Sequence, residues 1–220
     1  MRTEAELDAI RRRVVNVVGH ALRTPVTTLC GMADELARRA DDPEARAVLA
    51  DGVRRNARIV EQLLDDLLVA SDVGTALPVA DPADVDLAAR ARDVWDGYGD
   101  ARPLEISGQG QAHVAPPVAE GALAKLLDNA HRYSDGAVTV AVSTNDGRVI
   151  AEITSVGGLP SESEIPLVAE PFFRGEHAVM RSPGLGIGLT VARALAQHAG
   201  GDVDVVVAED RFTATLRLPS

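Results

Sequence analysis

Residues 19–25, Gly-His-Ala-Leu-Arg-Thr-Pro, lie inside a segment whose apolar residues recur at steps of three and four positions. This spacing predicts one long helix over residues 4–40. On that helix His20 and Thr24 are four residues apart, so they share one face, one turn from each other. Because Pro25 has no amide hydrogen, the carbonyl one turn earlier loses its helical hydrogen bond, and we expect a bend there. The sequence therefore predicts an imidazole on a solvent-facing helix surface beside a bend.

A second helix is predicted over residues 44–71, after the break at Asp41-Asp42-Pro43. Leucine, isoleucine and valine residues form a broad apolar stripe along it. Two antiparallel helices cannot bury two such stripes between themselves, so we expect a homodimer in which two hairpins form a four-helix bundle. The alternative is a single hairpin packed on the rest of its own chain.

The composition is that of an ordinary globular protein, with 220 residues of which 46% are apolar and 25% charged. The net charge of -11 argues against non-specific binding to nucleic acid or to an anionic membrane. Cys30 is the only cysteine, which excludes an intrachain disulfide and a cysteine metal cage. No apolar run is long enough to cross a membrane, so we expect no membrane segment in this chain and a cytoplasmic location.

Residues 72–85 are rich in Gly, Pro, Ala and Asp and lack periodicity, which predicts a linker. We therefore divide the chain into a helical hairpin (1–72), a linker (73–84) and a second domain (85–220). In the second domain the pattern predicts helices over 85–98, 117–133 and 185–199, and extended segments over 103–107, 137–143, 148–154, 203–207 and 212–218. Asn145-Asp146-Gly147 is a hairpin signal. The sum is an α+β sandwich with helices on one face of a mixed sheet.

Three motifs in the second domain carry residues suited to a nucleotide. Leu126–Ser134 places an amide, a cation and an aromatic ring on one helix, at Asn129, Arg132 and Tyr133. An amide oxygen can hold Mg²⁺, a guanidinium can hold phosphate oxygens, and a ring can lie against a purine. The alternative is a polar helix surface with a core tyrosine.

The second and third motifs surround a loop. Glu170–Gly175, Glu-Pro-Phe-Phe-Arg-Gly, precedes a loop over 176–183 that we expect to close over a nucleotide; alternatively its aromatic residues only anchor that loop. Gly184–Leu189, Gly-Leu-Gly-Ile-Gly-Leu, opens a helix. Glycines there let the backbone approach an anion and point amide hydrogens at it, although a flexible loop with a helix cap explains the same pattern.

In their order and spacing, the segments His-x-Leu-Arg-Thr-Pro, Leu-Leu-x-Asn-Ala-x-Arg-Tyr-Ser, Glu-Pro-Phe-Phe-Arg and Gly-x-Gly-x-Gly-Leu resemble those of bacterial sensor histidine kinases. The resemblance covers nearly the whole chain. It implies a dimerisation and histidine phosphotransfer hairpin followed by an ATP-binding domain of the gyrase type. It also implies ATP and Mg²⁺ as cofactors, and a response-regulator aspartate as the acceptor of the phosphoryl group.

The resemblance assigns roles to individual residues. His20 is the phospho-acceptor, Thr24 orients water for a phosphatase reaction, and Asn129 is the Mg²⁺ ligand. The other residues that it places around the nucleotide are Lys125, Arg132, Tyr133, Thr154, Gly158, Phe172, Gly184, Leu185, Gly186, Ile187, Gly188 and Leu189.

Three positions depart from the family pattern. Ala21 follows the histidine where an acid usually takes the imidazole proton, and Lys125 replaces an additional asparagine. The first glycine box lacks the acid that binds the adenine amino group: one alignment puts Thr154 there, and a slip of one residue puts Ser155 there. Losing a charge-assisted hydrogen bond costs about 1.5–3 kcal/mol.

Three functions remain open at this point. The leading one is a kinase that moves phosphate from ATP to His20 and then to a response regulator. The second is a degenerate relative that acts as phosphotransferase, response-regulator phosphatase or pseudokinase scaffold, which Ala21 and Thr154 favour and Asn129 opposes. The third is an ATP-binding regulatory module with an incidental histidine. The input comes either from a longer parent protein or from a separate sensor partner.

Overall fold

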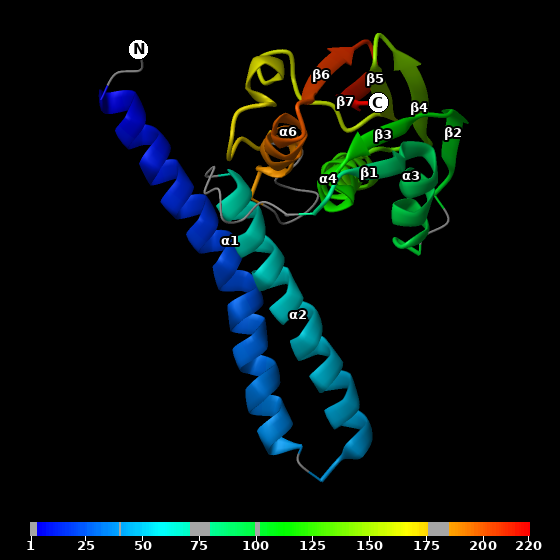
Figure 1. Cartoon of the computed structure of the whole chain (residues 1–220). Helices are drawn as coiled ribbons and strands as arrows, with labels where there is room; N and C mark the ends of the chain where they lie inside the picture. The colour runs from blue at the N-terminus through cyan, green and yellow to red at the C-terminus, as the bar shows by residue number, and fades with distance from the viewer. Residues whose placement is uncertain (1–3, 40, 71–79, 100–101, 176–184) are drawn as a thin grey trace. The chain divides into compact units, whose positions relative to one another are not determined.

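The computed structural model describes residues 4–39, 41–70, 80–99, 102–175 and 185–220, and the chain divides into two compact units that we describe one at a time. The first contains helix α1 (Glu4–Arg38) and helix α2 (Pro43–Ala70) (Figure 1). Both predicted helices are confirmed to within two residues. Helix α1 is continuous through Pro25, and the bend expected there stays a prediction.

Helices α1 and α2 approach each other closely at Gly52, which is buried. A side-chain carbon added there would lie 2.7 Å from the Met32 sulfur, so the glycine makes room for the methionine. Large apolar side chains nevertheless remain 44–65% exposed along both helices, namely Val26, Val48, Ile59, Leu64 and Leu68. The hairpin therefore leaves an apolar surface of the kind that a helix bundle buries.

The second unit is built on a five-stranded sheet whose strand order is β2-β4-β5-β7-β6. Its strands are β2 (Leu104–Gly108), β4 (Val138–Asn145), β5 (Arg148–Val156), β6 (Asp202–Ala208) and β7 (Arg211–Pro219). Strand β2 is parallel to β4, and the other neighbours are antiparallel. Helices α3 (Leu87–Asp96), α4 (Pro116–Tyr133) and α6 (Gly188–His198) cover one face (Figure 1). The predicted sandwich is confirmed.

Every second residue of each central strand points at the helices and is buried. The buried rows run across β4, β5 and β7 in register, as Val138–Ser155–Phe212, Val140–Ile153–Ala214 and Val142–Ala151–Leu216. Each valine, leucine or isoleucine side chain that is fully removed from water contributes about 1.5–3 kcal/mol. These rows fix the register, because a slip of one residue would turn every apolar side chain to the solvent face.

The sequence pattern predicts one helix over residues 85–98, and this prediction is wrong at its start. Strand β1 (Ala83–Asp86) comes first, and α3 begins only after Asp86, whose carboxylate accepts from the amides of Ala88 and Ala89 at 2.9 and 3.0 Å. This cap fixes the helix start. Strand β1 pairs with β3 (Gln111–Val114), a strand too short for the sequence pattern to reveal. Of the predicted linker, 73–79 lies outside the described residues and Ala83 already belongs to β1.

Two further boundaries follow from backbone conformation. The β4–β5 hairpin turns at Asp146 and Gly147, which both have positive φ (47° and 70°), as its sequence predicts. Helix α6 begins at Gly188, three residues later than predicted. Gly186 explains the difference, because its φ of 70° is left-handed and a right-handed helix cannot include it.

Candidate functional site

Helix α4 presents three of the predicted ligand-binding side chains on one face. Lys125, Asn129 and Arg132 are spaced by four and three residues, which aligns them along the helix. The opposite face holds the helix to the sheet through Leu126, Leu127 and Ala130, all buried. Among the described residues, the half-buried side-chain amide of Asn129 has no hydrogen-bond partner. That amide is therefore available to a ligand.

Arg132 pairs with Asp128, one turn earlier, through Nε and Oδ1 at 2.8 Å. The two side chains are 41% and 37% exposed, and an exposed pair of this kind contributes only about 0.2–1 kcal/mol. This ion pair with Asp128 by itself therefore does little to hold Arg132 away from a phosphate. Tyr133, the last residue of α4, is half-buried.

The aromatic motif and the glycine motif meet in the structure. The Phe172 amide donates to the Gly186 carbonyl at 2.9 Å, and a side-chain carbon on Gly186 would lie 2.4 Å from the Phe173 carbonyl oxygen. Phe172 itself has a positive φ of 64°. Leu185 and Ile187, the neighbours of Gly186, are buried. The contact thus sets the direction from which the chain enters α6.

The first turn of α6 is open to a ligand. Its N-cap residue, Ile187, makes no side-chain cap, so the amides of Gly188, Leu189 and Thr190 have no acceptor within the helix. A side-chain carbon built on Gly188 would meet no atom within 4 Å. Exposed amides at a helix start bind anions through hydrogen bonds and the helix dipole. The predicted contact Gly184 and the loop over 176–183 lie outside the described residues.

The end of β5 turns the two candidate residues of the first glycine box, Thr154 and Ser155, to opposite faces of the sheet. Thr154 points away from the helices, and its hydroxyl bonds the Thr213 hydroxyl of β7 at 3.0 Å. Ser155 points toward the helices, is 3% exposed, and donates to the Phe212 carbonyl at 3.5 Å. The structure therefore places Ser155, and not Thr154, on the helix-covered face. Gly158 follows with a φ of 61°.

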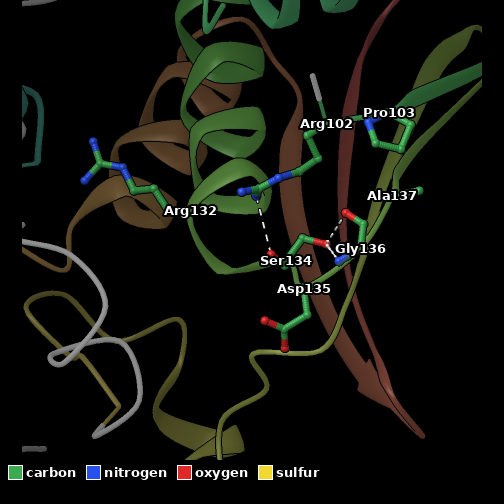
Figure 2. A pocket seen from close by; sticks show the side chains of 7 residues that line it. All are labelled: Arg102, Pro103, Arg132, Ser134, Asp135, Gly136 and Ala137. Atoms are coloured by element: carbon green, nitrogen blue, oxygen red, sulfur yellow. Dashed lines mark hydrogen bonds between the residues drawn. The ribbon is translucent and has the colours of Figure 1, made fainter. Parts of the chain in front are cut away.

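The turn after α4 is fastened to that same strand end. The Asp135 amide donates to the Val156 carbonyl at 2.8 Å, and the Ser134 hydroxyl lies 3.3 Å from the same carbonyl. Figure 2 shows this turn beside a hollow of about 530 Å³. Its lining is Arg102, Pro103, Arg132, Ser134, Asp135, Gly136 and Ala137.

Arg102 crosses the end of α4 and donates to the carbonyls of His131 and Ser134, which are orphan acceptors of the last helical turn. Neither Arg102 nor Asp135 belongs to a motif of the sequence analysis, and no local pattern singles them out. The fold brings them to α4 from separate segments, so only the structure identifies them.

Three aromatic rings fix α3 against the end of α4. Tyr98 stacks on His131 with ring centroids 4.2 Å apart, and Trp95 meets both rings edge-on. Burial raises the pKa of Tyr98, the Asp128 carboxylate raises it further, and Arg132 lowers it. The phenol therefore stays protonated near neutral pH. This cluster packs against the last turn of α4, which carries Arg132 and Tyr133.

The arrangement fits a magnesium nucleotide. The described residues contain no cluster of three His, Cys, Asp or Glu side chains suited to a metal ion. A metal here would take the Asn129 oxygen together with phosphate oxygens, which is how Mg²⁺ is commonly held. The amides of the first turn of α6 and the Arg132 guanidinium are hydrogen-bond donors of the kind that phosphate oxygens accept from. In the part of the chain that the structure describes, no helix is both long and apolar enough to cross a membrane.

Comparisons with known proteins match both units. A family model described as "His Kinase A (phospho-acceptor) domain" matches residues 10–75. A second, described as "Histidine kinase-, DNA gyrase B-, and HSP90-like ATPase", matches residues 118–220. The first of these ranges includes His20, and the second includes most of α4 and all of α6.

Individual relatives agree with these models. A bacteriophytochrome of Pseudomonas aeruginosa is 32% identical over 98% of this chain and 30% of its own length. The signal transduction histidine-protein kinase AfsQ2 of Streptomyces coelicolor is 30% identical over 94% and 42%. The chain thus spans less than half the length of these relatives. Among solved structures, the Acinetobacter baumannii histidine kinase AdeS shares the fold over 91% of this chain and 97% of its own, at 21% identity and a TM-score of 0.65.

Proposed function

The chain belongs to the bacterial sensor histidine kinase family, and from that membership we propose that it phosphorylates His20 with ATP and passes the phosphoryl group to a response-regulator aspartate. Residues 1–72 form the dimerisation and phosphotransfer hairpin, residues 73–84 the linker, and residues 85–220 the catalytic domain. The observation that carries the proposal is the order of the two matched models, with His20 inside the phospho-acceptor segment.

In the proposed reaction a nitrogen of His20 bonds to the γ-phosphorus of ATP. The bond from that phosphorus to its bridging oxygen breaks, and ADP leaves. Ala21 offers no base, and the reaction uses the neutral imidazole, which is a substantial fraction of histidine near pH 7. Thr24, exposed one turn after His20, orients water when the regulator is dephosphorylated.

Side chains of the catalytic domain hold the nucleotide. Asn129 would hold Mg²⁺, which would supply positive charge to the phosphates when bound, and Lys125 and Arg132 would contact phosphate oxygens. The amides of Gly184, Gly186, Ile187 and Gly188 line the phosphates, with Leu185 and Leu189 beside them. Tyr133, Phe172 and Gly158 border the base and sugar. Ser155 takes the place that one alignment gives to Thr154, since only Ser155 lies on the helix-covered face.

We also propose the assembly and the partners. Two hairpins form a four-helix bundle through the exposed apolar side chains of α1 and α2. The partners are a second copy, a receiver domain with its aspartate, and a sensor that is either part of a longer parent or a separate protein. The site of action is the cytoplasm, where ATP and response regulators are found.

The test is incubation with γ-labelled ATP and Mg²⁺. We expect acid-labile, alkali-stable label on the wild type, no label on His20→Ala, and none on Asn129→Ala because the metal loses its protein ligand. Labelling of His20→Ala would exclude this acceptor, and unchanged labelling of Asn129→Ala would exclude the magnesium role. A folded wild type that takes no label would favour the degenerate relative, for which the comparisons give no support.

A further inference from the structure

The helix-covered face at the end of β5 holds a hydroxyl where the family has a carboxylate. Ser155 occupies that place, and its buried hydroxyl already donates to the Phe212 carbonyl. Thr154 points to the other face and bonds Thr213. A nucleotide base that offers an amino group to this strand end therefore meets no negative charge from β5 itself.

A carboxylate from a different segment lies at the same strand end. Asp135 follows α4 by two residues, and its amide donates to the Val156 carbonyl at 2.8 Å. The hydroxyl of Ser134, which is 5% exposed, lies 3.3 Å from the same carbonyl and 3.1 Å from the Gly136 carbonyl, and donates its single proton to one of them. The amide bond holds the Asp135 backbone beside Val156, the last residue of β5, and so fixes where the Asp135 side chain begins.

The missing side chain of Gly157 gives the Asp135 carboxylate its position. A carbon built on Gly157 would lie 2.3 Å from Asp135 Oδ2, 2.8 Å from its Cγ and 2.8 Å from its Cβ. The carboxylate thus packs directly on the glycine backbone, which has a φ of 76° that a larger residue rarely adopts. Any side chain at 157 would displace the acid from this place.

The hollow beside Asp135 is also lined by Arg132, one of the α4 residues proposed to contact the nucleotide. Asp135 and Arg132 both line it, and Figure 2 shows their side chains leaving the end of α4 in different directions. A cation for phosphate and an anion for a base amino group therefore stand at two sides of one helix end. These two charges complement an aminopurine nucleotide, which offers negative phosphates to the cation and an amino group, a hydrogen-bond donor, to the anion.

We propose that Asp135 reads the amino group of adenine in place of the absent strand-end acid, an inference that rests on the proposed function. Its carboxylate accepts a hydrogen bond from the exocyclic amine. A purine with a carbonyl at that position repels the carboxylate, so the site prefers ATP to inosine or guanosine triphosphate. A purine nucleotide without the amine loses this bond and nothing else.

The test compares the dissociation constants of ATP and purine riboside triphosphate, which lacks the amine. For the wild type we expect ATP to bind about 10- to 150-fold more tightly, the equivalent of one charge-assisted hydrogen bond. Asp135→Ala keeps the amide bond to Val156 and should bring the ratio close to one. Asp135→Asn, a neutral acceptor, should give a ratio between the two.

Asp210→Ala is the matched control, because Asp210 is an exposed acid at the same sheet end whose backbone carbonyl accepts from the Gly157 amide. It should leave the ratio unchanged. Equal weakening of both nucleotides by Asp135→Ala would show a merely structural role and overturn the inference. A wild-type ratio near one would overturn it while leaving ATP binding intact. Failure of the wild type to bind either nucleotide would overturn the proposed function as well.

Discussion

Replacing Gly186 by alanine tests how the glycine segment enters α6. The residue has a φ of 70°, and the added carbon would lie 2.4 Å from the Phe173 carbonyl oxygen and 2.7 Å from Arg174 Cγ. The nearer of these atoms belongs to the backbone, so it cannot turn aside as a side chain does. The Gly186 carbonyl also accepts from the Phe172 amide. Alanine must therefore break this contact or shift both segments.

The magnitude follows from two contributions. A left-handed conformation costs an alanine about 1–2 kcal/mol. Forcing a methyl group into a packed place typically costs a further ~1–3 kcal/mol. We expect the free energy of unfolding of the second unit to fall by about 2–5 kcal/mol. With a urea dependence of roughly 2 kcal/mol per molar, the midpoint moves down by about 1–2.5 M.

Tryptophan fluorescence during urea unfolding measures this change. Trp95 is the only tryptophan and is buried in the second unit, so it reports that unit alone. Gly188→Ala is the matched control, because its added carbon meets nothing within 4 Å and alanine favours a helix. It should keep or slightly raise the midpoint. An unchanged midpoint for Gly186→Ala, or an equal loss for both variants, would refute the reasoning.

Two other changes give separate outcomes. Ala21→Glu restores an acid beside His20 and should raise the rate of autophosphorylation by up to about 10²-fold, since a general base typically accelerates a reaction ~10²–10⁴-fold. Ala21→Gln is the neutral control. If the glutamate variant is no faster than the glutamine variant, nucleotide binding limits the rate. Asp86→Ala removes two bonds to the amides of α3 and should lower the unfolding free energy by about 1 kcal/mol in the same fluorescence assay. Asp93→Ala on the same helix loses only an exposed ion pair to Arg90 and should change it by less than about 0.5 kcal/mol, so similar losses would contradict the capping role.

Long periodic segments were predictable from the sequence, and backbone details were not. The apolar spacing locates α1, α2 and α4, and Asn145-Asp146-Gly147 locates the β4–β5 hairpin, because each carries its signal locally. Strands β1 and β3 have four residues each, too few for alternation to stand out. Their pairing joins segments that are distant in the chain, and neither segment carries a local sequence signal for it. The start of α6 depends on the conformation of Gly186, which the sequence alone permits but does not require.

The candidate site divides in the same way. The motif residues of α4 and the glycine segment come from short, ordered patterns, and the structure brings Phe172 next to Gly186. Arg102 and Asp135 have no pattern. Arg102 donates to a carbonyl at the end of α4, and the Asp135 amide donates to Val156 at a strand end that lies well over a dozen residues further along the chain. A residue whose role depends on neighbours that are distant in the chain cannot be identified from local sequence patterns.

A strand settles what an alignment of the glycine box leaves open, because its side chains alternate between two faces. Thr154 and Ser155 both carry a hydroxyl and no carboxylate, so their chemistry alone does not show which of them aligns with the acid of the glycine box. Ile153 and Ala151 are buried against the helices, and alternation then assigns Ser155 to their face and Thr154 to the other. With Ser155 at the acid position, Gly157 becomes the first glycine of the box, and this glycine is the one on which the Asp135 carboxylate packs. The side-chain alternation that turns Thr154 away from the helices therefore also supports the proposal that an acid from another segment, Asp135, contacts the nucleotide base.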